Sequence, residues 1–254
     1  MILLLQLTCC TPSAWELQQE DHESYSPSGI DTIVGSEKAP VYYIESLSAS
    51  NKAIVIFPDI YGFSSRLRKI ADTLAAKGFH VMLLDCFHGD TAEGKPDLLA
   101  WLTKFPHESI LQDINAGLEF LLTKGVKEGE VSAIGFCWGG WAIAKSASEG
   151  ISWKSGVSPH PSTKLEKFAF GMDEELMFSK VSMPFLLMPA GEDPDILKPG
   201  SSVVKKLEEA GGASVPFESM RHGWVSRGDL SIPDVKENIE KALAQMLEFI
   251  EKQY

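Results

Sequence analysis

One cysteine of this chain lies where a reactive side chain could be held in a sharp turn. In the stretch AIGFCWGGWAIA, Cys137 has Gly135 two residues before it and Gly139 two residues after it. An apolar run typical of a strand precedes the cysteine, and small residues typical of a helix follow it. A strand that turns abruptly into a helix needs small residues at these two positions, because larger side chains would collide. The pattern predicts a nucleophile elbow, with the thiol at a helix N-terminus whose dipole favours a thiolate.

A thiol nucleophile needs a general base, and the base needs a carboxylate to orient it. Behind an elbow of this kind the chain order is nucleophile, acid, histidine. Downstream of Cys137 the histidines are His160 and His222, and His222 follows a predicted strand in MRHGWVSRGD. We therefore expect His222 to be the base. Asp193, in AGEDPD after another predicted strand, is the expected acid, with Asp195 as the second choice.

Two backbone N–H groups are expected to stabilise an oxyanion beside this thiol. The first belongs to Trp138, directly after the cysteine, and the second to Ile60, in the loop PDIYGFS that follows a predicted strand. Asp59 of that loop would then lie near Cys137, or would only form a turn. The alternative for Cys137 is a buried, inert cysteine beside glycines that allow close helix packing.

The elements that position these residues alternate between strand and helix. Continuous apolar runs predict strands at 52–59, 80–85, 131–136, 154–159, 183–190 and 214–220, with a further strand at 41–46. Helical periodicity or composition predicts helices that begin after Ser64 or Ser65 and end at Gly78, and at about 107–124, 138–148, 201–211 and 233–253. This alternation predicts an α/β fold with a mostly parallel sheet and helices on both faces. Residues 1–25 are expected to be an irregular lead-in, and residues 26–254 a single domain.

Composition narrows the classes of partner. The 254 residues carry a net charge of −12 without a basic run, which argues against nucleic acid and anionic membranes as partners. No stretch has the length of a transmembrane helix. The four cysteines lack a CxxC spacing, which suits a reducing compartment, and we expect a cytoplasmic protein. The start MILLLQLTCC lacks the basic residue and cleavage site of a signal peptide. His88 and His160 lack clustered ligand spacing, so neither a metal nor an organic cofactor is expected.

Through several motifs the chain resembles the eukaryotic branch of the dienelactone hydrolase family, which has the α/β-hydrolase fold. They are FPDIYGF, DCFHGD, GFCWGGW, SPHPS, AGEDPD, RHGWVSRGD and the double cysteine of CCTP. The resemblance implies a Cys–His–Asp triad and the hydrolysis of esters or lactones. In bacterial members a glutamate helps to convert the thiol into thiolate; Asp59 stands at that place here. Those members bind the substrate carboxylate with arginines, for which His88 or Arg227 are the candidates.

A small ester or lactone is the expected partner, bound by a monomer or homodimer. Tyr61, Phe87, Trp138 and Trp224 are candidates for an apolar pocket, or equally for core packing. Two other functions stay open. The first is a binding or redox-sensing protein in which Cys137 is an oxidisable thiol. The second is a glycan hydrolase, which would need two carboxylates such as Asp59 and Glu192 on either side of the bond that is cleaved.

Overall fold

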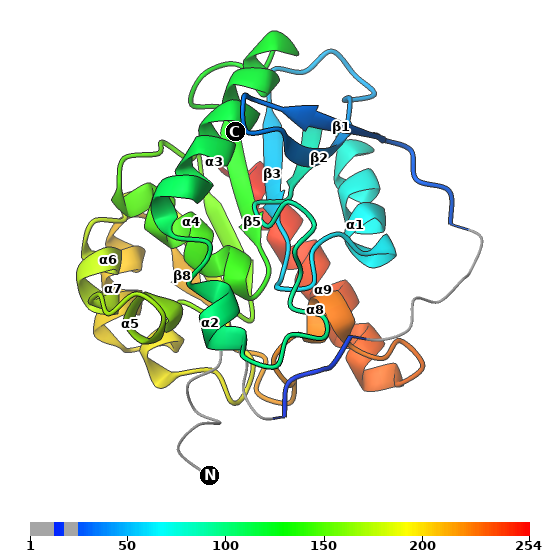
Figure 1. The fold of residues 1–254 in the computed structure, drawn as a ribbon. Coiled ribbons are helices and arrows are strands. Elements are labelled where there is room, and N and C mark those ends of the chain that lie inside the picture. Colours follow the sequence, from blue (N-terminus) through cyan, green and yellow to red (C-terminus); the bar gives the residue numbers. More distant parts are fainter. Residues whose placement is uncertain (1–12, 18–24) are drawn as a thin grey trace.

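The computed structural model describes residues 13–17 and 25–254 and places their strands in one eight-stranded sheet (Figure 1). The spatial order of the strands is β1-β2-β4-β3-β5-β6-β7-β8. Pairs β1·β2 and β2·β4 are antiparallel, and all the others are parallel, which confirms the predicted α/β fold with a mostly parallel sheet. The strands are Ile30–Val34 (β1), Ala39–Ile44 (β2), Ala53–Phe57 (β3), His80–Leu84 (β4), Val131–Gly135 (β5), Gly156–Pro159 (β6), Phe185–Met188 (β7) and Ala213–Ser214 (β8).

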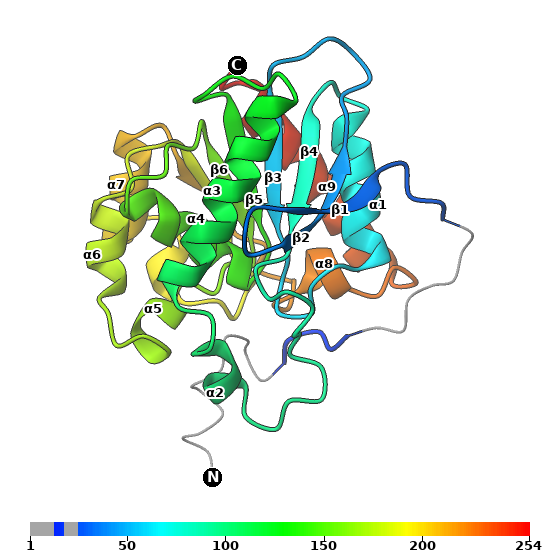
Figure 2. The same ribbon diagram turned by 45° about the horizontal axis from the view of Figure 1, so that its top comes forward.

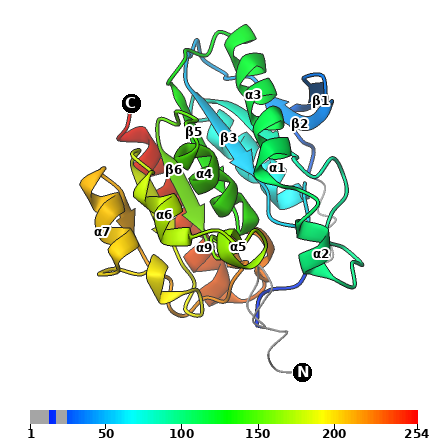
Figure 3. The same cartoon turned by 60° about the vertical axis from the view of Figure 1, so that its left-hand side comes forward.

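Helices cover both faces of the sheet, so strands β3 to β7 are buried throughout. Helices α1 and α9 pack on one face, and α3, α4, α6 and α7 on the other (Figures 2 and 3). Along β3 the side chains alternate between the two apolar clusters, since Val55 faces one and Ile54 the other. The helices are Ser65–Ala75 (α1), Leu98–Leu102 (α2), His107–Thr123 (α3), Trp138–Ser148 (α4), Leu165–Phe168 (α5), Glu174–Ser179 (α6), Ser202–Glu209 (α7), Trp224–Arg227 (α8) and Pro233–Glu251 (α9).

Local sequence signals explain where the long helices begin. The Ser64 side chain accepts a hydrogen bond from the Leu67 N–H and caps α1, as predicted. Helix α9 begins at Pro233, whose fixed φ suits the first helical position and whose missing N–H would have no intrahelical partner there. Both helices turn an apolar stripe towards the sheet, with Leu67, Ile70 and Leu74 buried on α1.

The structure corrects the prediction at both edges of the sheet. Strand β1 was not predicted, because Ile30 and Ile33 are exposed on an edge strand and give no core pattern. The predicted strand 214–220 is reduced to Ala213–Ser214, followed by a single bridge between Ala190 and Phe217. Pro216 has no N–H to donate, so the ladder is interrupted there. Short helices α2, α5, α6 and α8 were also missed, since they contain only about one turn each.

Part of the predicted lead-in is described. Residues 13–17 have no regular structure, and the Trp15 N–H donates to the carbonyl of His222 at 2.9 Å. They lie beside α8, at the end of the sheet where β3 and β5 end (Figure 1). The stretch MILLLQLTCC and the double cysteine of CCTP lie outside the described residues. None of the described helices combines the length and apolar character that a membrane crossing requires.

Candidate functional site

The sharp turn predicted at Cys137 is present. Strand β5 ends at Gly135 and α4 begins at Trp138, and Cys137 between them has φ 54° and ψ −109°. Both glycines are required, since a Cβ on Gly135 would lie 2.2 Å from the Gly139 oxygen, and one on Gly139 would lie 2.5 Å from the Phe57 oxygen. A non-glycine residue with this backbone is strained, which is typical of functional sites. The sulfur is buried at the N-terminus of α4.

Asp193 and His222 form a buried pair beside this turn. The His222 Nδ1 lies 2.7 Å from Asp193 Oδ1, and the second carboxylate oxygen accepts the Ala190 N–H at 2.8 Å. Asp193 comes from the turn after β7 and His222 from the loop after β8, so both belong to the carboxyl ends of parallel strands. Asp195, the second choice for the acid, lies in a 3₁₀ turn, and its exposed carboxylate is 3.5 Å from Lys198 Nζ. The contact to His222 is made by Asp193.

Ser162 joins the imidazole to the sulfur. Its hydroxyl oxygen lies 3.3 Å from Cys137 Sγ and 3.3 Å from His222 Nε2. Ser162 is the last residue of the motif SPHPS, and the sequence predicts no role for it. The available signal was its position directly after a predicted buried strand, at the same edge of the sheet as the other candidates. Four side chains from the ends of β5, β6, β7 and β8 thus form one connected polar group: Cys137, Ser162, Asp193 and His222.

His160 packs against this group. Its ring centroid is 5.1 Å from that of His222, in an edge-to-face arrangement, and its φ is 40°. Neither of its ring nitrogens has a hydrogen-bond partner. Burial, reinforced by His222, holds the pKa of His160 well below its ordinary value, so the ring is neutral. Within residues 13–17 and 25–254 there is no cluster of three or more candidate metal ligands around His160 or elsewhere.

Asp59, in the loop after β3, and Arg227, in α8, form a buried ion pair. The Asp59 carboxylate accepts from Arg227 Nη1 and also from the Tyr61 N–H at 2.9 Å. The guanidinium lies 5.1 Å from the centre of the Tyr61 ring and donates through Nε to the Trp15 carbonyl at 2.8 Å. The lead-in therefore contacts two of the predicted site segments, through His222 and through Arg227.

The remaining predicted site residues are placed as follows. Trp138 is the first residue of α4, where an N–H has no intrahelical partner, and Ile60 is buried in the loop after β3. His88 is directed at Asp113 of α3, with 2.9 Å between Nε2 and Oδ2. Trp224 is fully buried and packs against Phe217 with tilted rings whose centroids are 4.5 Å apart, which favours core packing over ligand contact.

A mostly parallel sheet with helices on both faces, an elbow after β5, and an acid and a histidine after β7 and β8 define an α/β-hydrolase. The model of the dienelactone hydrolase family matches residues 40–254. The chain therefore belongs to the dienelactone hydrolase family and is a hydrolase of that family.

Two curated relatives and one solved structure are similar to the chain. The chain is 27% identical to the human carboxymethylenebutenolidase homolog over 235 residues, which are 88% of this chain and 91% of that protein. It is 32% identical to the maize endo-1,3;1,4-beta-D-glucanase over 100 residues, which are 39% of this chain and 32% of that protein. The crystal structure of a dienelactone hydrolase-like promiscuous phosphotriesterase, P91 from metagenomic libraries, is similar in fold, with a TM-score of 0.66, 16% identity, and coverage of 89% and 98% of the two chains.

Proposed function

We propose that this hydrolase cleaves small activated carboxylic esters or lactones, with Cys137 as nucleophile, His222 as general base and Asp193 as the orienting acid. The observation that carries the proposal is the continuous polar contact from the Asp193 carboxylate through His222 and Ser162 to the sulfur of a strained elbow. A cysteine that only packed in the core would require neither this backbone nor these partners.

The Asp193 carboxylate sets the protonation of His222. It accepts from Nδ1 at 2.7 Å, so Nδ1 carries the hydrogen and Nε2 offers a lone pair. The thiol proton passes to Nε2, and the thiolate attacks the acyl carbon. The same carboxylate then stabilises the imidazolium that has formed.

The oxyanion of the tetrahedral intermediate would accept hydrogen bonds from the N–H groups of Trp138 and Ile60. A donor of this kind contributes about 10²–10³ in rate. When the intermediate collapses, the imidazolium gives its proton to the leaving alcohol, and the acyl group stays on Cys137 as a thioester. Water, activated by neutral His222, attacks the thioester, releases the acid and regenerates the thiol.

The thiol also determines the substrate class. A thiolate is a good leaving group, so the tetrahedral intermediate expels it again unless the substrate's own leaving group is comparably good. Aryl esters, enol lactones and thioesters meet this condition, whereas amides do not. Of the two candidate anion contacts, we assign Arg227 to a substrate carboxylate, since a guanidinium always carries its charge and can bind a carboxylate through two N–H groups. Arg227 meets such an anion only when Asp59 gives way, because the two are paired.

A panel of aryl esters, enol lactones and thioesters, assayed on the wild type, on Cys137→Ser and on Cys86→Ser, tests this proposal. We expect turnover of activated substrates by the wild type and by Cys86→Ser, and its loss in Cys137→Ser. Labelling of Cys137 by an activated ester without turnover would favour the binding or redox-sensing function instead.

Reducing-sugar release from a mixed-linkage β-glucan tests the glycan hydrolase alternative, to which the name of the maize relative points. That chemistry needs two carboxylates flanking the bond. Asp59 is buried and paired with Arg227, while Glu192 is exposed and accepts from Ser13. Release that persists in Cys137→Ser would contradict the thiol mechanism.

A further inference from the structure

Ser162 contacts both ends of the proton transfer that the proposed function requires. Its hydroxyl oxygen is 3.3 Å from Cys137 Sγ and 3.3 Å from His222 Nε2, and the residue is buried. A hydroxyl both donates and accepts, so a single group can serve the thiol and the imidazole together.

The Asp193 contact fixes the direction of these hydrogen bonds. Because His222 Nδ1 carries its hydrogen towards the carboxylate, Nε2 of the neutral ring can only accept. The Ser162 hydroxyl therefore donates to Nε2. Its oxygen lone pair is then turned to the S–H of Cys137, which donates. The chain of donors runs from sulfur to oxygen to nitrogen, which is the direction in which the proton must move.

The backbone holds Ser162 against the elbow. The Ser162 N–H donates to the Cys137 carbonyl at 2.9 Å, and the Cys137 N–H is 3.4 Å from the Pro159 carbonyl. Two residues before the serine, the His160 N–H donates to the Met188 carbonyl at 2.9 Å, so the segment is also attached to β7. The serine thus moves with the nucleophile and with the strand that leads to Asp193.

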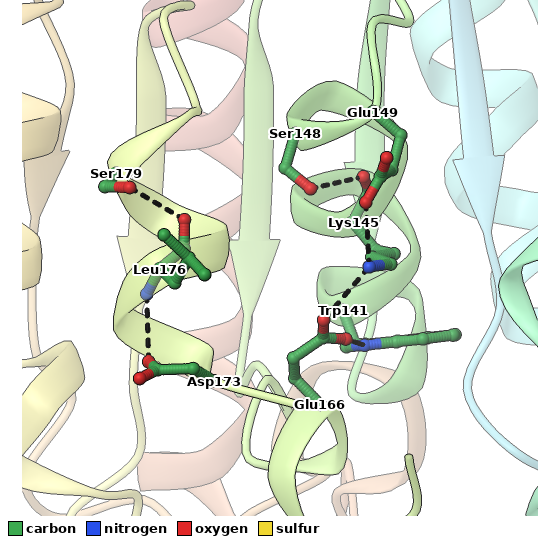
Figure 4. Close-up of polar contacts among 8 residues, drawn as sticks. All are labelled: Trp141, Lys145, Ser148, Glu149, Glu166, Asp173, Leu176 and Ser179. Carbon is green, nitrogen blue, oxygen red and sulfur yellow. Dashed lines mark hydrogen bonds and ion pairs between the residues drawn. The ribbon is translucent and has the colours of Figure 1, made fainter. Parts of the chain in front are cut away.

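The other end of this segment is anchored on the nucleophile's own helix. Glu166 lies in α5, four residues after Ser162, and is buried. Its carboxylate accepts from Trp141 Nε1 at 2.8 Å and from Lys145 Nζ at 3.1 Å (Figure 4). Both partners lie on α4, which begins next to Cys137. A charged group that is buried and fully paired is costly to displace, so the contact restricts the position of the loop between β6 and α5.

We propose that Ser162 is a further catalytic residue, whose hydroxyl carries the proton from Cys137 to His222; this role rests on the proposed function. The S–H bond breaks as the proton passes to the serine oxygen, and the serine O–H bond breaks as its own proton passes to Nε2. The products are a thiolate and an imidazolium, with the hydroxyl restored. The hydroxyl now donates to the thiolate, which stabilises the charged form and lowers the pKa of Cys137.

Alkylation of Cys137 by iodoacetamide tests this role without any ester. Trypsin releases residues 128–145 as a fragment in which Cys137 is the only cysteine, so its alkylation is measured by mass separately from the others. Rates are taken across about pH 5 to 10, the range that covers shifted and ordinary thiols. The variants are Ser162→Ala and, as a matched control, Ser155→Ala, which removes a buried hydroxyl at the opposite end of β6 that contacts Ser132.

We expect the midpoint of alkylation to rise by about one to two pH units in Ser162→Ala, the size set by a hydrogen bond to a charged group. Ser155→Ala should keep the wild-type midpoint. The proposal would be overturned if folded Ser162→Ala had the same alkylation midpoint as the wild type. Should that variant not fold, Ser162→Thr and Ser162→Val form an isosteric pair that differs in the hydroxyl; equal midpoints in the two would overturn it as well.

The ester panel, run on the same variants, separates this proposal from the proposed function. If the alkylation midpoint rises in Ser162→Ala but the wild type turns over no ester, the role of Ser162 is supported and esters are excluded as substrates. If the wild type and Ser162→Ala have equal ester turnover and equal alkylation midpoints, Ser162 does not have the proposed role. The hydrolase mechanism would then be unaffected.

Discussion

The turn after β4 and the turn after β5 each hold a buried cysteine with a His–Asp pair nearby, and they differ in how these groups are arranged. The two strands flank β3 in the sheet. Each is followed by a buried cysteine, Cys86 or Cys137, and a His–Asp pair is associated with each turn. Beside the turn after β4 the pair is His88–Asp113, in which Nε2 faces the acid. Beside the turn after β5 it is His222–Asp193, which come from the ends of β8 and β7 and in which Nδ1 faces the acid.

The differences lie in the backbone and in the order of contacts. Cys86 is outside the left-handed region, and Asp85 fixes its turn by accepting the N–H groups of Phe87 and Gly89 at 2.9 and 2.8 Å. No hydrogen bond joins Cys86 to His88, both of which the structure describes. Burial, with the negative charges of Asp113 and Asp85, raises the pKa of the Cys86 thiol well above its ordinary value. In the proposed function, the elbow and its polar contacts therefore distinguish Cys137 from Cys86, and residue composition does not.

The largest expected effect comes from removing each sulfur in turn. Cys137→Ala should reduce p-nitrophenyl acetate turnover by about 10³-fold or more, to the background rate, because no nucleophile is left on the elbow. Cys86→Ala should retain activity within about twofold, since that sulfur only packs in the core. Comparable losses in both variants would remove the functional distinction between the turns.

The two His–Asp pairs provide the next comparison. Asp193→Asn should lower kcat/KM by about 10²–10⁴-fold, because an amide no longer holds His222 in the tautomer whose Nε2 accepts. Asp113→Asn should leave kcat/KM within about threefold, since His88 is directed at Asp113 and has no part in the proposed proton transfer. Both variants are assayed at saturating and limiting substrate. A loss of activity in Asp113→Asn as large as in Asp193→Asn would show that His88 takes part in the reaction.

The glycines of the two turns test the backbone part of the comparison. Gly135→Ala should destabilise the protein by about 3 kcal/mol or more, because its Cβ would lie 2.2 Å from the Gly139 oxygen in the elbow. Gly89→Ala meets no atom within 4 Å, but its φ of +83° costs an L residue about 1–2 kcal/mol. Urea denaturation midpoints measure both. A Gly135→Ala variant as stable as Gly89→Ala would contradict the close approach at the elbow.

The two thiols can also be compared by how the alkylation rate of each depends on pH. The pKa of Cys86 lies above its ordinary value, so its thiolate is scarce at neutral pH and forms only as the pH rises beyond about 9. Cys137, beside the imidazole and at the N-terminus of α4, should react at neutral pH. Alkylation of the two fragments is measured in the same sample. Faster labelling of Cys86 than of Cys137 at about pH 7 would contradict this order.

The elbow could be predicted from the sequence because its requirements are local. Gly135 and Gly139 are spaced by the sterics of one turn, and the strand and helix on either side have their own patterns. Asp193 and His222 could be selected because chain order and strand ends restrict the candidates. These signals depend on residue type and on position along the chain.

The contacts that could not be predicted join distant segments through side-chain direction. Ser162 reaches Cys137 and His222 only because of the register of β6 beside β5 and β7, which the sequence does not display. Asp59 and Arg227 are separated by 168 positions, and Trp15 and Arg227 by 212. Residues without a helical or strand pattern, such as Trp15, give no signal of where they pack.

Trapping the acyl-enzyme tests the central claim most directly. Wild-type protein is mixed with p-nitrophenyl acetate, quenched in acid during the first turnover and digested with trypsin, and the mass of the fragment 128–145 is measured. The account predicts one acetyl group on this fragment, located at Cys137, and none on the fragment that carries Cys86. Ester turnover with no acetyl group on Cys137, or with the group on another side chain, would contradict it.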